Sequence, residues 1–221
     1  MKIIEPSFEI INPKPEELRE RIYWVLEAAG RTCYKSETDI TEESAAKFIQ
    51  RRVLEGHESI LEHAVMTVRF VVDRGVSHEL VRHRLCAFSQ ESTRYCNYSK
   101  NKFGNELTFI RPFYLDETSP EYVKWETSCQ VAESTYLSML TNGCKPEEAR
   151  AVLPNSLKTE VMMTANMREW RHILKLRAAG YSGKPHPQMK QVMLPLLTYL
   201  QEVMPEVFGD IELDYSGTFH E

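Results

Sequence analysis

The stretch RHRLCAFSQESTRY, residues 82–95, gathers arginine side chains around an imidazole and several hydroxyls. The triplet RHR occupies 82–84, and STRY follows at 92–95 after seven intervening residues. A guanidinium is a rigid planar fork of N–H groups that matches phosphate and carboxylate oxygens two at a time. The stretch therefore indicates a site for an anionic ligand. The alternative is a solvated basic face that pairs with the many carboxylates of the chain.

The composition is that of an ordinary globular protein. Of the 221 residues, 42% are hydrophobic and 27% are charged, which is enough for one substantial core. The formal net charge of -5 argues against broad nucleic-acid binding, for which a basic total is expected. We therefore expect a single domain over residues 1–221, whose local basic clusters bind small anions and no nucleic acid.

The cysteines and the apolar runs bear on the compartment. Five cysteines, at 33, 86, 96, 129 and 144, are an odd number without a C-x-x-C pair, which indicates neither a disulfide framework nor a zinc knuckle. No apolar run approaches the roughly 20 residues of a membrane helix. Glu5 and Pro6 interrupt the N-terminal residues too early for a signal peptide. We expect a cytoplasmic protein in a reducing compartment, with no membrane partner.

Hydrophobic periodicity in the first part of the chain predicts alternating strands and helices. Gly30 supplies a stop for the first helix, and Thr41 before two glutamates is the predicted N-cap of the second, which ends at Gly56. The predicted elements are strands at 2–4, 8–12 and 64–72 and helices at 16–29, 41–56 and 76–84. The last helix carries the RHR triplet, whose side chains, about 100° apart, would reach different parts of a ligand.

In the rest of the chain, polar residues without a clean period at 85–100 predict an ordered binding loop. Ser119-Pro120 is a strong helix start, and Asn142-Gly143 is the corresponding stop. The other predicted elements are strands at 107–110 and 157–164 and helices from 146 to before 154, at 166–178 and at 187–203.

The apolar stripe of the predicted helix at 166–178 contains an arginine. A wheel of about 100° per residue puts Arg177 among the apolar residues, and it puts a second polar group, Arg168, His172 and Lys175, on another side. Burial of an unpaired guanidinium costs several kcal/mol, so Arg177 snorkels past the helix end, pairs with an acidic residue or meets an anionic ligand. The two polar faces indicate two binding tasks.

Several sequence blocks resemble, in the same order, those of the flavin-dependent thymidylate synthases. The triplet at 82–84, with Ser92 and Arg94, is similar to the RHR-x7-S-x-R signature of that family. The other blocks are GHESILEH at 56–63, RAVLP at 150–154 and the segment from Asn166-Met167-Arg168 to Arg177. Together they cover residues 15–180, and several blocks at compatible spacing are more specific than the signature alone.

The resemblance implies a fold and a set of site residues. The fold is α/β (α+β), with a mostly antiparallel sheet and flanking long helices in a single domain. The residues carried over by motif as flavin contacts are Cys33, Ser59, Glu62, Arg82, His83, Arg84, Asn166, Arg168 and His172. Those carried over as substrate contacts are Glu79, Gln90, Glu91, Ser92, Thr93, Arg94, Arg150 and Arg177, with Arg177 as the catalytic group. No metal is implied.

The family resembled here converts dUMP to dTMP by reductive methylation. It uses FAD as the redox centre, NADPH as the reductant and 5,10-methylenetetrahydrofolate as the carbon donor, and its sites lie where the subunits of a homotetramer meet. The share of the protein in such a reaction is positioning and electrostatics. The resemblance implies that Arg94 and Arg150 hold the phosphate and that Arg177, against the uracil carbonyls, stabilises negative charge on the ring.

Three positions depart from the family pattern. Family members often have Ser where Ala87 stands, Asn where Ser89 stands and Gln where Glu79 stands. Because a contact to the uracil nucleotide is expected at Glu79, its negative charge either weakens phosphate binding or pairs with a neighbouring arginine.

One alternative from another class is a non-catalytic RNA-binding module. It would use Arg84 and Arg94 for phosphate contacts and Tyr95 and Tyr98 for base stacking. A colourless protein that binds oligonucleotides would favour it.

A second alternative is a metal-dependent nucleotide hydrolase. It would be built on His57, His63 and His83, although His57 and His63 lack the H-E-x-x-H spacing that places two ligands on one helix face. A metal assay would reveal it.

Overall fold

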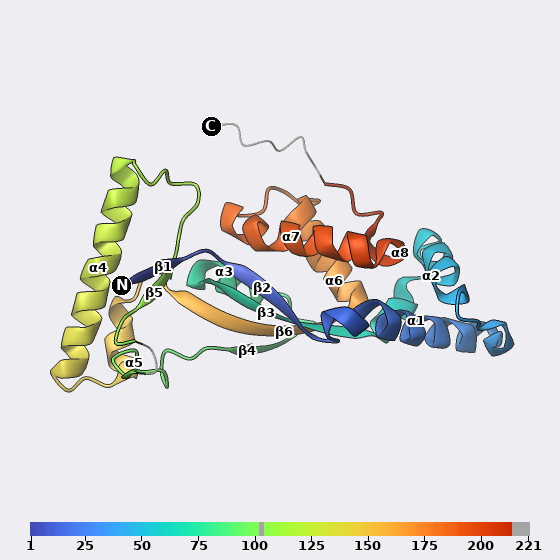
Figure 1. Ribbon diagram of the computed structural model, residues 1–221, viewed down its shortest axis with the longest axis horizontal. Coiled ribbons are helices and arrows are strands. Elements are labelled where there is room, and N and C mark those ends of the chain that lie inside the picture. Colours follow the sequence, from blue (N-terminus) through green and yellow to red (C-terminus); the bar gives the residue numbers. More distant parts are fainter. Residues whose placement is uncertain (102–103, 214–221) are drawn as a thin grey trace. The chain divides into compact units, whose positions relative to one another are not determined.

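The computed structural model of the chain describes residues 1–101 and 104–213 (Figure 1). Contacts divide the chain into two compact units. Unit 1 consists of Met1–Ser7, Phe70–Arg82 and Phe88–Val161, and unit 2 consists of Phe8–Arg69, His83–Ala87 and the chain from Met162 onward. The expectation of a single domain over residues 1–221 stays a prediction.

Unit 1 contains a short parallel strand pair. The strand β1 (Lys2–Ile4) pairs with β5 (Thr108–Ile110), and Ile3 lies opposite Phe109 in the register. Figure 1 shows this pair beside a long helix, α4, and the short helix α5. Helical elements in the described part of this unit include α3 (Arg74–Leu80), α4 (Pro120–Thr141), α5 (Pro146–Ala149) and the 3-10 turn η5 (Arg150–Val152).

The helix α4 begins and ends where the sequence predicts. The Ser119 hydroxyl accepts the N–H of Tyr122, and Pro120 occupies the first helical position, where its missing N–H costs nothing. One side of α4 packs into an apolar cluster, and the Trp125 indole donates to the Ser156 hydroxyl over 2.9 Å. The buried members of this cluster are Tyr98, Leu107, Phe109, Cys129, Tyr136, Ala149 and Leu157.

A four-stranded sheet has the order β2-β3-β6-β4 and is mostly antiparallel, as the resemblance implies. Its strands are β2 (Ser7–Asn12), β3 (Val65–Asp73), β6 (Lys158–Asn166) and β4 (Ala87–Gln90). Both β3 and β6 contain residues of both units. Buried residues alternate with half-buried ones along β6, which is the pattern of a strand with one face on a core.

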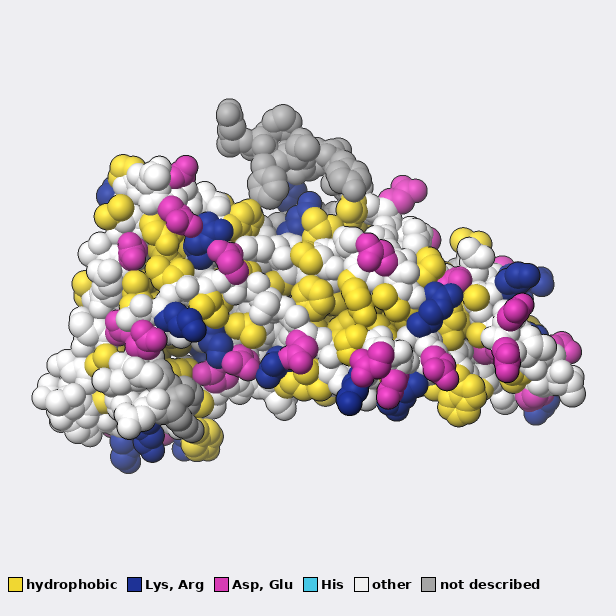
Figure 2. All heavy atoms as spheres, viewed as in Figure 1, with side chains coloured by type: hydrophobic (Ala, Val, Ile, Leu, Met, Phe, Trp, Pro, Cys, Tyr) yellow, Lys and Arg dark blue, Asp and Glu magenta, His cyan; other side chains and the backbone are white. Residues whose placement is uncertain are grey.

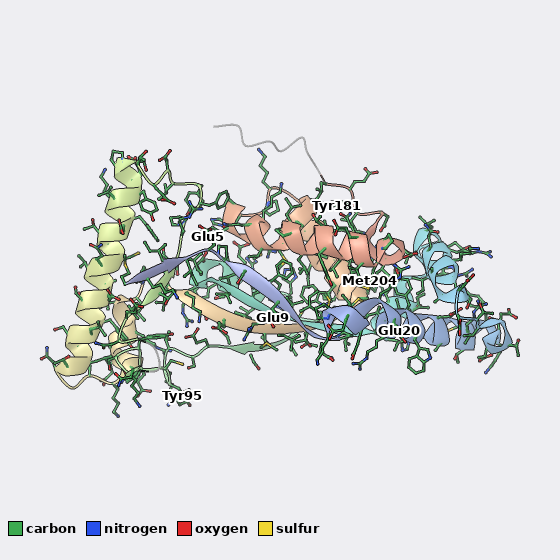
Figure 3. The ribbon with its side chains drawn as sticks, viewed as in Figure 1. Glu5, Glu9, Glu20, Tyr95, Tyr181 and Met204 are labelled. Atoms are coloured by element: carbon green, nitrogen blue, oxygen red, sulfur yellow. The ribbon has the colours of Figure 1, made fainter. Side chains whose placement is uncertain are left out.

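The helices of unit 2 bury their apolar stripes against one another. The first two, α1 and α2, pack together; α8 packs on α2 and on α7, and α7 also packs on the π-helical turn η6. Met204, at the junction of α7 and α8, is fully buried (Figure 3). The elements are α1 (Leu18–Tyr34), α2 (Ser44–Leu54), α6 (Met167–Leu174), η6 (Lys175–Ala179), α7 (Pro187–Val203), α8 (Pro205–Phe208) and the 3-10 turns η1 (Pro15–Glu17), η2 (Glu37–Asp39) and η3 (Glu58–Glu62).

The predicted helix stop at Gly30 is wrong. The helix α1 continues to Tyr34. Its C-cap is Lys35, which adopts the left-handed conformation with φ of 51°. Gly30 lies inside the helix, where a Cβ atom would stand 2.4 Å from Cε1 of Phe48. This glycine therefore permits a close approach of α2 to α1, and the extra turn of helix carries Cys33.

The predicted N-cap at Thr41 is also wrong, because α2 begins at Ser44 after Glu43. The Ser44 hydroxyl accepts the backbone N–H of Thr41 and donates to Oε1 of Glu27 over 2.7 Å. The loop before α2 is thereby tied to α1, and Thr41 is left without a capping bond in that helix.

The predicted helix at 76–84 is shifted. Asp73 caps α3 by accepting the N–H of Val76, and the helix ends at Leu80, so the RHR triplet lies in the turns that follow. The predicted loop at 85–100 contains β4, which is concealed in the sequence because Phe88 is its one large apolar residue.

Three surface and side-chain features bear on the compartment and the partners. In the described parts of the chain no helix is long and apolar enough to cross a membrane. The five cysteines are free thiols. Figure 2 shows acidic side chains interspersed with Lys and Arg over the described residues of the face in view, which is not the arrangement of a broad basic patch.

Candidate functional site

Unit 2 contains a cavity of about 670 Å³ along one face of α6. Its lining combines cationic, acidic and amide side chains from α6, η6 and η3 with one residue that follows the RHR triplet. The lining residues are Glu58, Glu62, Leu85, Asn166, Arg168, Glu169, Arg171, His172 and Lys175. A cavity of this size accommodates a small molecule or part of a cofactor.

Asn166 fixes the start of the helix that forms this wall. Its Oδ1 accepts the N–H of Glu169 over 2.8 Å, a cap that leaves the amide nitrogen as a donor. Helical spacing then places Arg168, His172 and Lys175 along the cavity, on one face as the wheel predicts. The partial positive charge of the helix N-terminus adds to the attraction for an anionic group.

Arg168 is held at the mouth of the cavity by two carboxylates. Its Nη1 donates to Oε1 of Glu62 over 2.5 Å, and its Nε lies 3.7 Å from Oε2 of Glu58. Half of the side chain stays exposed, so this pair is of the weakly stabilising surface kind and a ligand phosphate can compete for the guanidinium.

Arg171 is the buried arginine of α6, and the sequence reading missed it. Only 2% of its side chain is exposed, and it donates two hydrogen bonds to Asp210, at 2.6 and 2.7 Å, one to Glu58 and one to the Val207 carbonyl. A signal was available, because the wheel that drew attention to Arg177 also places Arg171 next to the apolar stripe. The pairing with Asp210 and Glu58 stabilises the wall formed by η3.

A second cavity of unit 2, of about 320 Å³, shares Glu58 and Arg168 with the first. Arg52 lies in its wall, 9% exposed, and donates from Nη1 to the Tyr34 hydroxyl over 2.9 Å. The same hydroxyl lies 2.9 Å from Nδ1 of His57. The lining residues are Cys33, Tyr34, Arg52, Gly56, His57, Glu58, Ser59, Ile60 and Arg168.

The donor set of the two cavities fits a flavin dinucleotide. Arg168 and Lys175 match pyrophosphate oxygens, while Glu58 and Glu62 accept from ribose hydroxyls or ring N–H groups. The Nε of Arg52 is buried without a hydrogen-bond partner, which is the kind of donor that a ligand oxygen satisfies.

The structure brings most of the predicted flavin contacts to these cavities. The predicted flavin contacts that line at least one of the two cavities are Cys33, Ser59, Glu62, Asn166, Arg168 and His172. The three residues of the triplet do not, because Arg82 and Arg84 are exposed in turns and His83 is buried. His83 lies next to the lining, its ring centroid 6.2 Å from that of His172.

Arg177 does not continue the α-helical wheel, because it lies in the π-helical turn η6. A π-turn rotates its side chains away from the α-helical positions. Arg177 is half-buried, and its Nε donates to Nε2 of His83 over 3.1 Å. Arg171 pairs with Asp210 and Glu58, and Arg177 contacts an imidazole.

Most of the predicted nucleotide contacts belong to unit 1, where the structure gathers the segment Gln90–Arg94 with Arg150. Nη1 of Arg150 lies 3.4 Å from the Thr93 hydroxyl, and Arg94 pairs with Glu147 at 2.9 Å. The Ser92 hydroxyl accepts the N–H of Arg94 in a local turn. Both guanidiniums are therefore near this one turn, as a phosphate site requires. The remaining two contacts are Glu79, half-buried on α3, and Arg177, which belongs to unit 2.

Gln90 and Glu91 are committed to internal bonds at the end of β4. The Gln90 amide donates to the Ser77 hydroxyl over 2.9 Å. The carboxylate of Glu91 accepts from the Tyr98 hydroxyl and from Lys158, at 2.9 and 3.0 Å. Burial would lower the pKa of Lys158, but its bonds to Glu160 and Glu91 outweigh this and raise it. Glu91 also lines a cavity of about 310 Å³ in unit 1.

The RNA-binding alternative loses one of its stacking groups. Tyr98 is 6% exposed and bonded to Glu91, so no base can stack on it. Tyr95 is exposed on the outside of unit 1 (Figure 3). A single aromatic residue beside Arg94 does not form the platform that single-stranded binding uses.

The hydrolase alternative is not supported by the histidine positions. Among the described residues, the group with metal-ligand spacing is His83, Glu169 and His172. Neither His57 nor His63 belongs to it.

Comparisons with known proteins identify the family of the chain. The model of the family described as thymidylate synthase complementing protein matches residues 22–206. The flavin-dependent thymidylate synthase of Mycobacterium avium is 30% identical over 207 residues, which cover 86% of this chain and 79% of that protein. The enzyme of the same name from Geobacter sulfurreducens is 29% identical over 189 residues, 82% of this chain and 78% of that protein.

A solved structure has the same fold. The crystal structure of the UMP/dUMP methylase PolB from Streptomyces cacaoi, bound with 5-Br dUMP, superposes with a TM-score of 0.76. It covers 95% of this chain and 96% of PolB at 22% sequence identity. With the family model matched over most of its length, the chain belongs to the flavin-dependent thymidylate synthase family.

Proposed function

We propose that the protein is a thymidylate synthase that converts dUMP to dTMP by reductive methylation. FAD is the redox cofactor, NADPH its reductant and 5,10-methylenetetrahydrofolate the carbon donor. The observation that carries the proposal is the gathering of Cys33, Ser59, Glu62, Asn166, Arg168 and His172 around two cavities that share Glu58 and Arg168.

The two cavities of unit 2 supply different parts of a dinucleotide site. Arg168, at their common wall, neutralises pyrophosphate charge, and Lys175 adds a second cation on one side. Glu62 then turns from its bond with Arg168 to a ribose hydroxyl or a ring N–H. The exchange is inexpensive because the Arg168 pair is exposed to solvent.

The nucleotide phosphate is bound in unit 1. Arg94 and Arg150 provide two guanidiniums, and Ser92 and Thr93 provide hydroxyls beside them. The phosphate replaces Glu147 as the partner of Arg94. This exchange costs little because the Arg94–Glu147 pair is exposed to solvent, and exposed pairs are weak.

The chain contributes positioning and charge stabilisation to the reaction. When bound, reduced FAD supplies the hydride for the reduction. Arg177 lies against the uracil carbonyls and stabilises the negative charge that develops on the ring, with preorganised donors of this type worth about 3 kcal/mol each. Its guanidinium cannot act as a base, because arginine stays protonated at all relevant pH values.

The assembly is a homotetramer with its sites at subunit interfaces, and the protein works in the cytoplasm. The predicted flavin contacts come from segments far apart in the sequence, from Cys33 to His172, and this spread supports a site to which more than one subunit contributes. Sedimentation of the flavin-loaded protein tests this. A fully active monomer would contradict it.

The function is tested by the visible spectrum of protein reconstituted with FAD. We expect bound-flavin absorption that bleaches anaerobically with NADPH and returns when dUMP and 5,10-methylenetetrahydrofolate are added together. Arg21→Ala is a matched control, because Arg21 is an exposed cation of unit 2 that pairs with Glu17 and lines neither cavity. A protein that stays colourless after reconstitution would overturn the proposal.

A further inference from the structure

We propose that His83 and Glu169 are positioning residues that hold the Arg177 guanidinium in its working orientation. The inference rests on the proposed function, in which Arg177 acts on the nucleotide. His83, the central residue of the RHR triplet, is buried, with 6% of the residue exposed.

The contact between Arg177 and His83 fixes the state of the imidazole. Nε of Arg177 carries a hydrogen and can only donate, so Nε2 of His83, 3.1 Å away, must accept with its lone pair. A protonated ring has no lone pair to offer. His83 is therefore neutral, and its proton is on Nδ1.

The other ring nitrogen faces a buried carboxyl group. Nδ1 of His83 lies 3.8 Å from Oε1 of Glu169, beyond a direct hydrogen bond but within range of a strong charge–dipole interaction. Burial raises the pKa of Glu169. The carboxylate favours the ring orientation that presents Nδ1–H to it, and this orientation directs the Nε2 lone pair to Arg177.

Local backbone structure holds both partners in register. The carbonyl of His83 accepts the N–H of Cys86, which closes the turn after the triplet. On the other side, η6 ends at Gly180, whose φ of 83° allows the N–H of Tyr181 to bond the Lys175 carbonyl. The turn after the triplet and the C-terminal end of the π-turn are thereby fixed, with Arg177 against His83.

A metal ion is the rival occupant of this group. The ligand atoms of His83, Glu169 and His172 lie within 4.8 Å of one another. However, a metal needs a histidine lone pair, and that of His83 is engaged by a guanidinium that would repel a cation. The cluster therefore serves the arginine and not a metal.

Loss of the contact should reduce turnover and not binding. When Arg177 is present but no longer oriented by His83, charge stabilisation on the ring weakens while most ground-state contacts persist. A misplacement of about 1 Å typically lowers kcat by roughly 100-fold. We expect kcat to fall by roughly 100-fold. The KM for dUMP and the flavin content should change by less than about threefold, because the lost interaction acts mainly in the transition state.

A matched pair of variants at His83 tests the acceptor. In His83→Gln the amide oxygen reaches the place of Nε2, so Arg177 keeps an acceptor; in His83→Asn the shorter side chain does not reach it. We expect His83→Gln to retain most of the wild-type kcat and His83→Asn to lose it. The opposite order, or equal flavin loss in both variants, would overturn the inference and make His83 a flavin ligand.

A double-mutant cycle separates coupling from general damage. Arg177→Lys keeps a cation but lacks the Nε–H donor, so adding His83→Asn to it should lower kcat no further. Full additivity of the two losses would contradict the inference. Zinc titration should give the same result for the wild-type protein and for His172→Ala. A zinc site that is present in the wild type and lost in His172→Ala would favour the metal.

A measurement independent of activity distinguishes this inference from the proposed function. In protein labelled with 15N-histidine, His83 should show an unprotonated Nε2 and a protonated Nδ1, and Arg177→Ala should alter the Nε2 shift. A ring protonated at Nε2 would overturn the contact even if dTMP is formed. Wild-type protein that shows this tautomer but makes no dTMP would instead overturn the proposed function alone.

Discussion

Nε of Arg177 donates a hydrogen bond of 3.1 Å to Nε2 of His83, a residue 94 positions earlier in the sequence. The contact joins the central residue of the RHR triplet to the second arginine-bearing segment, and both partners belong to unit 2. Arg168 and Arg177 of that segment have different surroundings, because Arg168 lies on the wall of two cavities while Arg177 faces a buried imidazole.

These different surroundings predict different losses for two alanine variants. Arg177→Ala should lower dTMP formation by about 100- to 1000-fold while flavin absorption persists, because one preorganised donor is removed. Arg168→Ala should lose flavin first. Bound flavin and turnover are measured on the same samples, and equal losses of both in the two variants would show that this prediction is wrong.

The pair of Arg171 and Asp210 should contribute measurably to the stability of unit 2. Asp210→Asn breaks a hydrogen-bonded pair in which the guanidinium is buried, and this costs about 3 kcal/mol because part of the positive charge is left unmatched. Thermal unfolding should show Tm lowered by roughly 6 to 12 °C. Glu17→Gln, which breaks an exposed pair with Arg21, is the control and should change Tm by less than about 2 °C.

The same pair predicts a pH dependence. The hydrogen bonds from Arg171 lower the pKa of Asp210 below its ordinary value of 3.8. The carboxylate therefore contributes stability that is fully present above pH 3.8 and is lost as the pH falls through the folded-state pKa. Chemical unfolding measured from pH 6 down to the acid limit of folding should show a shallower acid loss in Asp210→Asn than in the wild type. Parallel profiles would contradict the assignment.

Ser92, although central to the signature, should not be a nucleophile. Its hydroxyl accepts the N–H of Arg94, and serine needs an adjacent base to attack at neutral pH. Ser92→Ala should keep measurable dUMP methylation, with nucleotide binding weakened by about 1 to 3 kcal/mol for one hydrogen bond to a charged group. A nucleotide adduct trapped on Ser92 and found by mass spectrometry would refute this.

Position 30 should require glycine because of the adjacent Phe48 ring and not because of the helix conformation. Alanine gains about 1 kcal/mol over glycine inside a helix, but overpacking costs about 1 to 3 kcal/mol, and a Cβ at Gly30 would overlap the Phe48 ring. Gly30→Ala should therefore destabilise the wild type and stabilise a Phe48→Leu background in urea unfolding. The same sign in both backgrounds would mean that Phe48 is not the cause.

Much of the fold could be predicted from local signals. Helix α4 is delimited by Ser119-Pro120 and Asn142-Gly143, and β6 by its alternation, because caps and period-two burial act over a few residues. Gly30 could not be interpreted correctly, since a helix stop and a close helix crossing both favour glycine. Choosing between them requires the position of Phe48, which is a tertiary fact.

Part of the candidate site could also be predicted from local signals, and part could not. The motif residues around Arg168 could be placed together because helical spacing fixes one face of α6. The contact of Arg177 could not be predicted, because a π-turn changes the rotation per residue and nothing in the sequence 175–179 announces it. Arg52 and Glu169 were missed because each is defined by its burial, which depends on the packing of distant segments.

The central claim is tested most directly by the product. Protein loaded with FAD is incubated anaerobically with dUMP, NADPH and 5,10-methylenetetrahydrofolate, and the nucleotides are analysed by mass spectrometry. We expect dTMP to form with flavin-loaded protein and to be absent when flavin is removed or NADPH is omitted. No dTMP from flavin-loaded protein with all three substrates, or equal dTMP from flavin-free protein, would contradict it.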